Sequence, residues 1–252
     1  MPYYSRDNYR LYYYIDGKGQ PVVFLHGYLG SSKSHWGKQL ENPDLSSQFQ
    51  LIAPDLRGYA KSSLGKRVEK NKTEDHILDI RMLLIDELKL NKNPIFVGYS
   101  VGGTLALMYA IKYPGSTQAI VLVSPRPFLH ETTRAWNFLA KEKRTGKKKS
   151  AFASFLWSIV KRFQKLLSYI YTKRRLRKSQ NYLQQLEELE FPILMLYGNK
   201  DTVNPSIAFE VLKKHLPQAQ IIEFDGDHGI THEHYEEFNK ILLEFLNESK
   251  IT

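Results

Sequence analysis

Short apolar runs alternate along the chain with longer stretches in which apolar residues recur every three or four positions. Seven runs have the length and composition of strands: 10–15, 21–26, 50–53, 94–98, 119–124, 192–197 and 220–224. Most are uninterrupted apolar runs, which is typical of parallel strands covered on both faces. The first run is joined to the second by the glycine-rich sequence 16–19, which predicts an antiparallel hairpin at the edge of the sheet.

The intervals between these runs have helical periodicity. Thr73 is a suitable N-cap for a helix whose first turn carries two acidic residues. Apolar residues then follow at Ile77, Ile80, Leu84 and Leu88. Near the C-terminus a second apolar stripe comprises Phe238, Ile241, Leu242, Phe245 and Leu246. Strands that alternate with helices predict an α/β fold, with a mainly parallel sheet of about eight strands flanked by helices.

The alternation is interrupted after residue 125. Nine apolar residues between Phe152 and Ile170 recur at helical spacing, and clusters of Lys and Arg lie on both sides of them. We therefore expect residues 1–125 and 191–252 to form the core, and residues 126–190 to form a basic helical cap inserted after the sixth strand.

Positive charge is concentrated in this insertion. Residues 126–182 contain 16 Lys or Arg and two acidic residues, a balance of +14, whereas the whole chain carries +10. The rest of the chain is therefore at −4. One interpretation is a lid helix that buries its apolar face. The other is a segment that contacts an anionic membrane surface through its basic residues. Binding of nucleic acid is the less favoured use of the same charge.

Composition excludes several classes of protein and of chemistry. No apolar run is long enough to cross a membrane, and the N-terminus has no apolar signal core. The absence of cysteine excludes disulfides and thiol catalysis. We expect a cytoplasmic protein, with the basic segment as its candidate contact with a membrane.

The sequence Gly98-Tyr99-Ser100-Val101-Gly102 lies between a predicted buried strand and a predicted helix. A serine in such a turn is held clear of the sheet, where a substrate can reach it. The two glycines are expected because a side chain at either position would collide with the neighbouring strand or helix. Ser100 is therefore the candidate nucleophile.

An acid and a histidine follow in order after later strands. Asp201 comes shortly after the strand at 192–197, and His228 follows the strand at 220–224. A serine needs a base, and the base needs an acid that orients it and stabilises its cation. Asp225 and Asp227 also lie close to His228 in the sequence and remain alternatives to Asp201, although aspartate is also common in turns.

With the order Ser, Asp, His, the chain resembles serine hydrolases of the α/β-hydrolase fold over almost everything outside 126–190. The resemblance implies that backbone N–H groups of Val101 and Tyr28 stabilise an oxyanion. It also implies that His26 braces its turn. The sequence from Asp55 to Ser62 resembles the family's loop with a structural Asp and Arg, with Ala60 in place of the second glycine.

Other chemistry is less well supported by the sequence. His228, His232 and His234 are close in sequence, but Gly229 interrupts the helix that a metal site would need. No glycine spacing for binding a nucleotide is present. We expect neither a cofactor nor a metal.

The function that we expect is hydrolysis of a small-molecule carboxylic ester with an apolar acyl group, through an acyl-enzyme. The fold also hosts thioesterases, C–C bond hydrolases or lyases and perhydrolases. A non-catalytic module that binds a ligand or a membrane surface is an alternative of another class.

Overall fold

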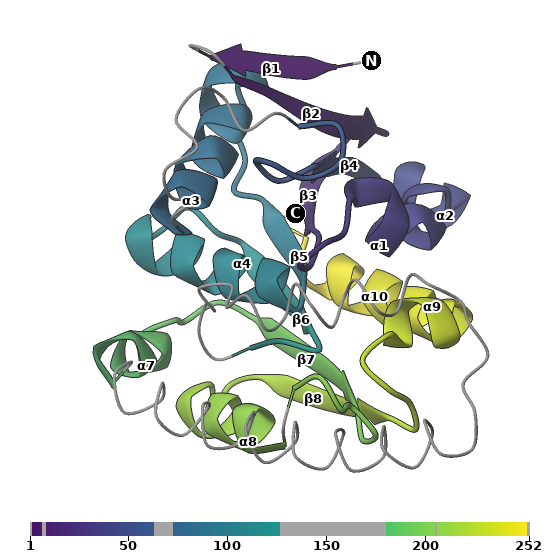
Figure 1. Ribbon diagram of the computed structural model, residues 1–252, viewed down its shortest axis with the longest axis vertical. Coiled ribbons are helices and arrows are strands. Elements are labelled where there is room, and N and C mark those ends of the chain that lie inside the picture. Colours follow the sequence, from purple (N-terminus) through teal and green to yellow (C-terminus); the bar gives the residue numbers. More distant parts are fainter. Residues whose placement is uncertain (1, 7–8, 63–72, 127–179, 205, 251–252) are drawn as a thin grey trace, which may run out of the picture.

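The computed structural model describes residues 2–6, 9–62, 73–126, 180–204 and 206–250. A single sheet of eight strands forms its centre, in the order β1-β2-β4-β3-β5-β6-β7-β8 (Figure 1). The strands are β1 (Tyr3–Arg6), β2 (Tyr9–Asp16), β3 (Gln20–Leu25), β4 (Phe49–Pro54), β5 (Ile95–Tyr99), β6 (Ala119–Val123), β7 (Ile193–Gly198) and β8 (Gln220–Phe224). The pairs from β4 to β8 are all parallel. The predicted fold class is confirmed.

The predicted hairpin between the first two strand-like runs is wrong. The strand β4 lies between β2 and β3, antiparallel to β2 and parallel to β3. The antiparallel partner of β2 at the edge of the sheet is β1, which sequence analysis did not predict. Glycines at 17 and 19 mark a reversal of the chain, but a reversal does not determine which strand fills the neighbouring position in the sheet.

Helices cover both faces of the sheet (Figure 1). They are α1 (Ser32–Leu40), α2 (Pro43–Ser46), α3 (Thr73–Met82), η1 (Leu83–Glu87), α4 (Val101–Lys112), α7 (Gln180–Glu187), α8 (Ser206–His215), α9 (Ile230–Glu233) and α10 (Tyr235–Glu248). Residues of α3, η1, α4, α7 and α8 belong to the core on one face, and residues of α1, α9 and α10 belong to the core on the other.

The central strands contribute to both cores, because successive side chains point to opposite faces. In β3, Val23 and Leu25 belong to one core, whereas Val22 and Phe24 belong to the other. All four are fully buried. This explains why the strand is an uninterrupted apolar run in the sequence.

Two helices were predicted in detail. The C-terminal stripe forms the buried face of α10, as expected. The stripe that begins at Ile77 is divided between α3 and the π-helical turn η1, which ends at Glu87. Leu83 is buried beside Leu84 in this wider turn.

The predicted cap lies largely outside the described residues, so the division into core and cap stays a prediction. The helix α7 falls within the 126–190 range, and its Leu183 and Leu186 are buried in the core that also contains α4 and α8 residues. Within the described ranges, no helix combines the length and apolar character needed to cross a membrane.

Candidate active site

Ser100 lies in a sharp turn between β5 and α4. Its backbone has φ 53° and ψ −111°, a conformation that non-glycine residues rarely adopt. The Ser100 N–H donates to the carbonyl oxygen of Val123, at 2.8 Å, which ties the turn to the end of β6. Strain of this kind persists only where the surrounding structure enforces it, and it is concentrated at functional sites.

The glycines on either side of Ser100 allow backbone segments to approach each other closely. A Cβ atom on Gly98 would lie 2.5 Å from the Cα of Gly103. A Cβ atom on Gly102 would lie 2.1 Å from the carbonyl oxygen of Leu25, at the end of β3. Both distances are far below any normal contact, so the expected reason for these glycines is confirmed.

Asp201 is the acid that contacts the His228 ring. The distance between His228 Nδ1 and Asp201 Oδ2 is 2.6 Å. The other oxygen of Asp201 accepts from the backbone N–H groups of Val203 and Asn204, at 2.8 and 2.9 Å. With the Asp201 side chain only 1% exposed, both carboxylate oxygens have protein donors. Such an acid holds a histidine in one orientation and one tautomer.

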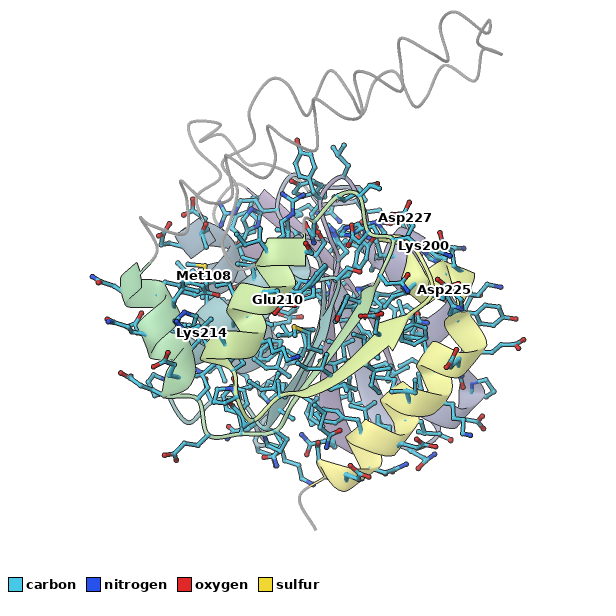
Figure 2. All side chains as sticks on the ribbon, turned by 90° about the horizontal axis from the view of Figure 1, so that it is seen from below. Met108, Lys200, Glu210, Lys214, Asp225 and Asp227 are labelled. Carbon is cyan, nitrogen blue, oxygen red and sulfur yellow. The ribbon has the colours of Figure 1, made fainter. Side chains whose placement is uncertain are left out.

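The two alternative acids make other contacts. Asp227 accepts from the backbone N–H of His228 at 2.7 Å and from that of Thr202 at 3.3 Å. Asp225 forms an exposed ion pair with Lys200 at 2.7 Å, and the two residues lie side by side at the surface (Figure 2). The structure therefore brings Asp201, rather than Asp225 or Asp227, to the imidazole of His228.

Tyr99 links the turn of Ser100 to His228 through a ring contact. The ring of Tyr99, which precedes Ser100, lies 5.1 Å from the His228 ring, measured between centroids. Burial is the main cause that raises the pKa of the Tyr99 hydroxyl, with nearby carboxylates contributing. Tyr99 is therefore neutral, and its ring packs against that of His228.

His26 braces the turn after β3, as expected. Its Nε2 accepts from the Leu56 N–H at 2.8 Å, so the ring proton is on Nδ1 and is donated to the Gly27 carbonyl, also at 2.8 Å. Burial lowers the pKa of His26 to about 4, which keeps the ring neutral. With both nitrogens occupied, His26 has no free position for accepting a proton from a substrate.

Tyr28 and Val101 are the residues that the family resemblance assigns as oxyanion donors. Tyr28 lies in a turn closed by the hydrogen bond from Gly30 N–H to Gly27 O, at 3.3 Å, and its ring packs edge-on against Tyr59. Val101 is the first residue of α4, where backbone N–H groups have no acceptor within the helix. The roles of both as oxyanion donors stay predictions.

His35 is a further residue at this turn that sequence analysis did not single out. Its Nδ1 accepts from the Gly27 N–H at 3.1 Å, and its ring packs edge-on against Tyr99 at 4.7 Å. Burial, together with neighbouring histidines, lowers the pKa of His35 to about 3. A neutral acceptor is therefore available to the Gly27 amide. No motif marks this position, because the contact depends on how α1 packs beside β3.

The predicted structural residues of the 55–62 loop also have partners. Asp55 is buried and accepts from the Ser32 N–H and hydroxyl, at 2.7 and 2.8 Å. Arg57 forms a two-pronged ion pair with Asp79, whose Nε–Oδ2 distance is 2.7 Å. Ala60 has φ 46°, a conformation that suits the glycine usual in the family pattern.

Metal ligation has no support in the part of the chain that the structure describes, where no three His, Asp or Glu side chains are grouped to hold an ion. His232 instead donates from Nε2 to the Ser34 carbonyl at 2.8 Å.

Comparison with known proteins gives a family match and several relatives. A family model described as alpha/beta hydrolase fold matches residues 20–235. The AB hydrolase superfamily protein YisY of Bacillus subtilis is 26% identical, over 92% of this chain and 93% of its own. A proline iminopeptidase of Xylella fastidiosa is 36% identical, but only over 46% of this chain and 36% of its own.

A solved structure from a study of carboxylesterases of Nitrososphaera gargenis shares the fold. It superposes with a TM-score of 0.73 at 22% identity and covers 98% of both chains. At this identity the likeness concerns the fold alone.

Proposed function

The chain belongs to the alpha/beta hydrolase fold family, and we propose that it is a serine hydrolase that cleaves a carboxylic ester with an apolar acyl group. The observation that supports this proposal is the pairing of His228 with Asp201 at 2.6 Å, together with the packing of the His228 ring against Tyr99, which directly precedes the strained Ser100. A histidine that is oriented by a buried acid is suited to activating an adjacent alcohol.

In the first half of the proposed reaction, His228 Nε2 takes the proton from the Ser100 hydroxyl. The oxygen attacks the ester carbonyl carbon, and the N–H groups of Tyr28 and Val101 stabilise the developing oxyanion. Because Asp201 contacts Nδ1, the opposite nitrogen is available to the serine. His228 then donates its proton to the leaving alcohol, which leaves the acyl group on Ser100.

In the second half, His228 takes a proton from water, and the hydroxide attacks the acyl-enzyme. This attack gives a tetrahedral intermediate. When it collapses, His228 returns the proton to the Ser100 oxygen and the carboxylic acid is released. The reaction needs no group beyond the side chains and backbone amides already described.

The ester is favoured over other substrates by the apolar stripe between residues 152 and 170, which lies outside the described residues. The same side chains can also serve a thioester, a C–C bond or an amide. Because the chain is similar to a proline iminopeptidase, the assay must also include a substrate with an amide bond.

The test is labelling by a fluorophosphonate, followed by hydrolysis of p-nitrophenyl esters of increasing acyl length. Wild-type protein should be labelled, whereas Ser100→Ala should not. Ester turnover should fall by at least ~10³-fold in the variant, with the melting temperature preserved. A proline p-nitroanilide and an acyl thioester are run in parallel.

Two results would contradict the proposal in different ways. Equal labelling of wild type and Ser100→Ala would show that Ser100 is not the nucleophile. The second result is labelling at Ser100 with faster turnover of the amide or thioester than of any ester. It would support the serine mechanism but show that the proposed substrate class is wrong.

We also propose that the basic segment 126–182 contacts anionic membrane surfaces. Its balance of +14 against −4 elsewhere supports this role, since each Lys or Arg near an anionic surface contributes about 1 kcal/mol. The residues lie outside the described ranges. Co-sedimentation with phosphatidylserine vesicles at low and high salt tests the idea, and protein that ignores them at low salt would refute it.

A further inference from the structure

Two consecutive residues at the end of β6 hold the backbones of the proposed nucleophile and base. The Val123 carbonyl accepts from the Ser100 N–H at 2.8 Å. The Ser124 hydroxyl donates to the carbonyl of His228 at 3.1 Å. Ser100 and His228 are far apart in the sequence, but their main chains are hydrogen-bonded to two consecutive residues, Val123 and Ser124.

Asn204 fastens the turn of the acid to the same place. Its backbone N–H donates to Asp201 Oδ1 at 2.9 Å. Its side-chain Nδ2 donates to the carbonyls of Ser124 and Pro125, at 2.7 and 3.2 Å. Asn204 therefore contacts the carboxylate of the acid through its backbone N–H, and through its buried side chain it contacts the residue that holds the histidine.

Ser124 and Asn204 both occupy positions that are unusual for their residue types. Ser124 is fully buried and has φ 44°, in the region that favours glycine. Asn204 is only 1% exposed, a burial that is uncommon for an amide side chain. Buried polar groups persist where they are hydrogen-bonded, and strained residues persist where the surroundings enforce them. Here both features occur at the point where the segments bearing Ser100, Asp201 and His228 meet.

We propose that Ser124 and Asn204 are positioning residues, which hold the Asp201 turn and the His228 loop in register with Ser100. The inference rests on the serine hydrolase function proposed above. Neither residue contacts a reacting atom. Their effect is on the distance and alignment between base and nucleophile, where an error of about 1 Å is sufficient to reduce a rate by about 100-fold.

The experiment compares Ser124→Gly, Asn204→Leu and a control, Asn239→Leu. Glycine at 124 relieves the strained φ and removes the hydroxyl. If the role of Ser124 were purely structural, Ser124→Gly would have normal or raised stability and normal rates. Asn239 is the matched control because it is also a buried amide, hydrogen-bonded to Gln39 Nε2 at 2.7 Å, but on α10. The readouts are melting temperature, the rate constant of fluorophosphonate labelling, and kcat and KM on a soluble p-nitrophenyl ester.

We expect Ser124→Gly and Asn204→Leu to lower the labelling rate and kcat by about 10- to 100-fold, with KM changed less than about twofold. Asn239→Leu should lower the melting temperature and leave kcat unchanged. Rates are expressed per folded molecule, and Ser124→Gly alone decides the question if Asn204→Leu does not fold.

The inference is overturned if Ser124→Gly keeps the wild-type labelling rate, or if Asn239→Leu loses kcat to the same extent. Failure of the proposed function has a different signature. In that case wild-type protein and Ser100→Ala are labelled alike, before any positioning variant is considered.

Discussion

The turn that presents Ser100 should not tolerate a side chain at Gly102, whereas a helical glycine elsewhere should. A Cβ on Gly102 would lie 2.1 Å from Leu25 O, 2.6 Å from Leu25 C and 2.9 Å from His26 O. All three are backbone atoms, so relief requires movement of β3 or α4. In contrast, a Cβ on Gly37, in α1, would meet nothing within 4 Å.

The two substitutions by alanine should therefore have opposite signs. Forcing a methyl group into a packed site costs about 1–3 kcal/mol and occasionally more. Against backbone atoms we expect the upper part of that range. Replacing glycine by alanine inside a helix stabilises the folded state by about 1 kcal/mol. We expect Gly102→Ala to lose about 2 kcal/mol or more, and Gly37→Ala to gain up to about 1 kcal/mol.

Thermal unfolding followed by circular dichroism measures both. For a chain of this size, 1 kcal/mol shifts the melting temperature by about 2–4 °C. Gly102→Ala should melt at least ~4 °C below wild type, and Gly37→Ala up to ~4 °C above it. Gly102→Ala should also be labelled more slowly by a fluorophosphonate, because Leu25 directly precedes the His26–Tyr28 turn. Wild-type stability and labelling in Gly102→Ala would refute the close approach on which this reasoning depends.

Two further predictions concern protonation and the acid. The folded protein holds the pKa of His26 near 4, below the ordinary value of about 6.5, so the unfolded chain takes up this proton first. This contribution to stability is complete above pH 6.5 and declines as the pH falls towards 4, by up to ~3 kcal/mol, and urea unfolding at pH 7 and pH 4.5 should show it. A urea midpoint that does not change between these pH values would contradict it. Asp201→Asn should lower kcat by about 10³- to 10⁴-fold, whereas Asp227→Asn should cost less than about tenfold, because an amide oxygen still accepts from the His228 N–H. If Asp227→Asn is the more damaging variant in ester turnover, the acid is wrongly assigned.

Local patterns in the sequence were sufficient for most of the fold. The buried strands β3 to β7 are apolar runs because both faces of the sheet are covered, and this property is visible in a single sequence. The sequence around Ser100 was also informative, since its two glycines are required by backbone contacts that any such turn must make.

The partner of β2 was not predictable in this way. Pairing depends on which strand fills the position between β2 and β3, and β4, which fills it, is separated from β2 by more than 30 residues. The choice among the three aspartates was similarly open. All three are close to His228 in sequence or in the family pattern, and only the folded turn shows that Val203 and Asn204 hold Asp201 while Lys200 pairs with Asp225.

The close approach of backbones also extends to the other side of the site. A Cβ on Gly198, the last residue of β7, would lie 2.3 Å from the carbonyl oxygens of both Asp227 and Gly226. The loop that bears His228 is therefore packed against the end of β7 just as the serine turn is packed against the end of β3. No side chain separates either turn from its neighbouring strand. The geometry of the proposed catalytic residues thus depends first on main-chain contacts, and the side chains of Ser124 and Asn204 add the links that backbone packing does not supply.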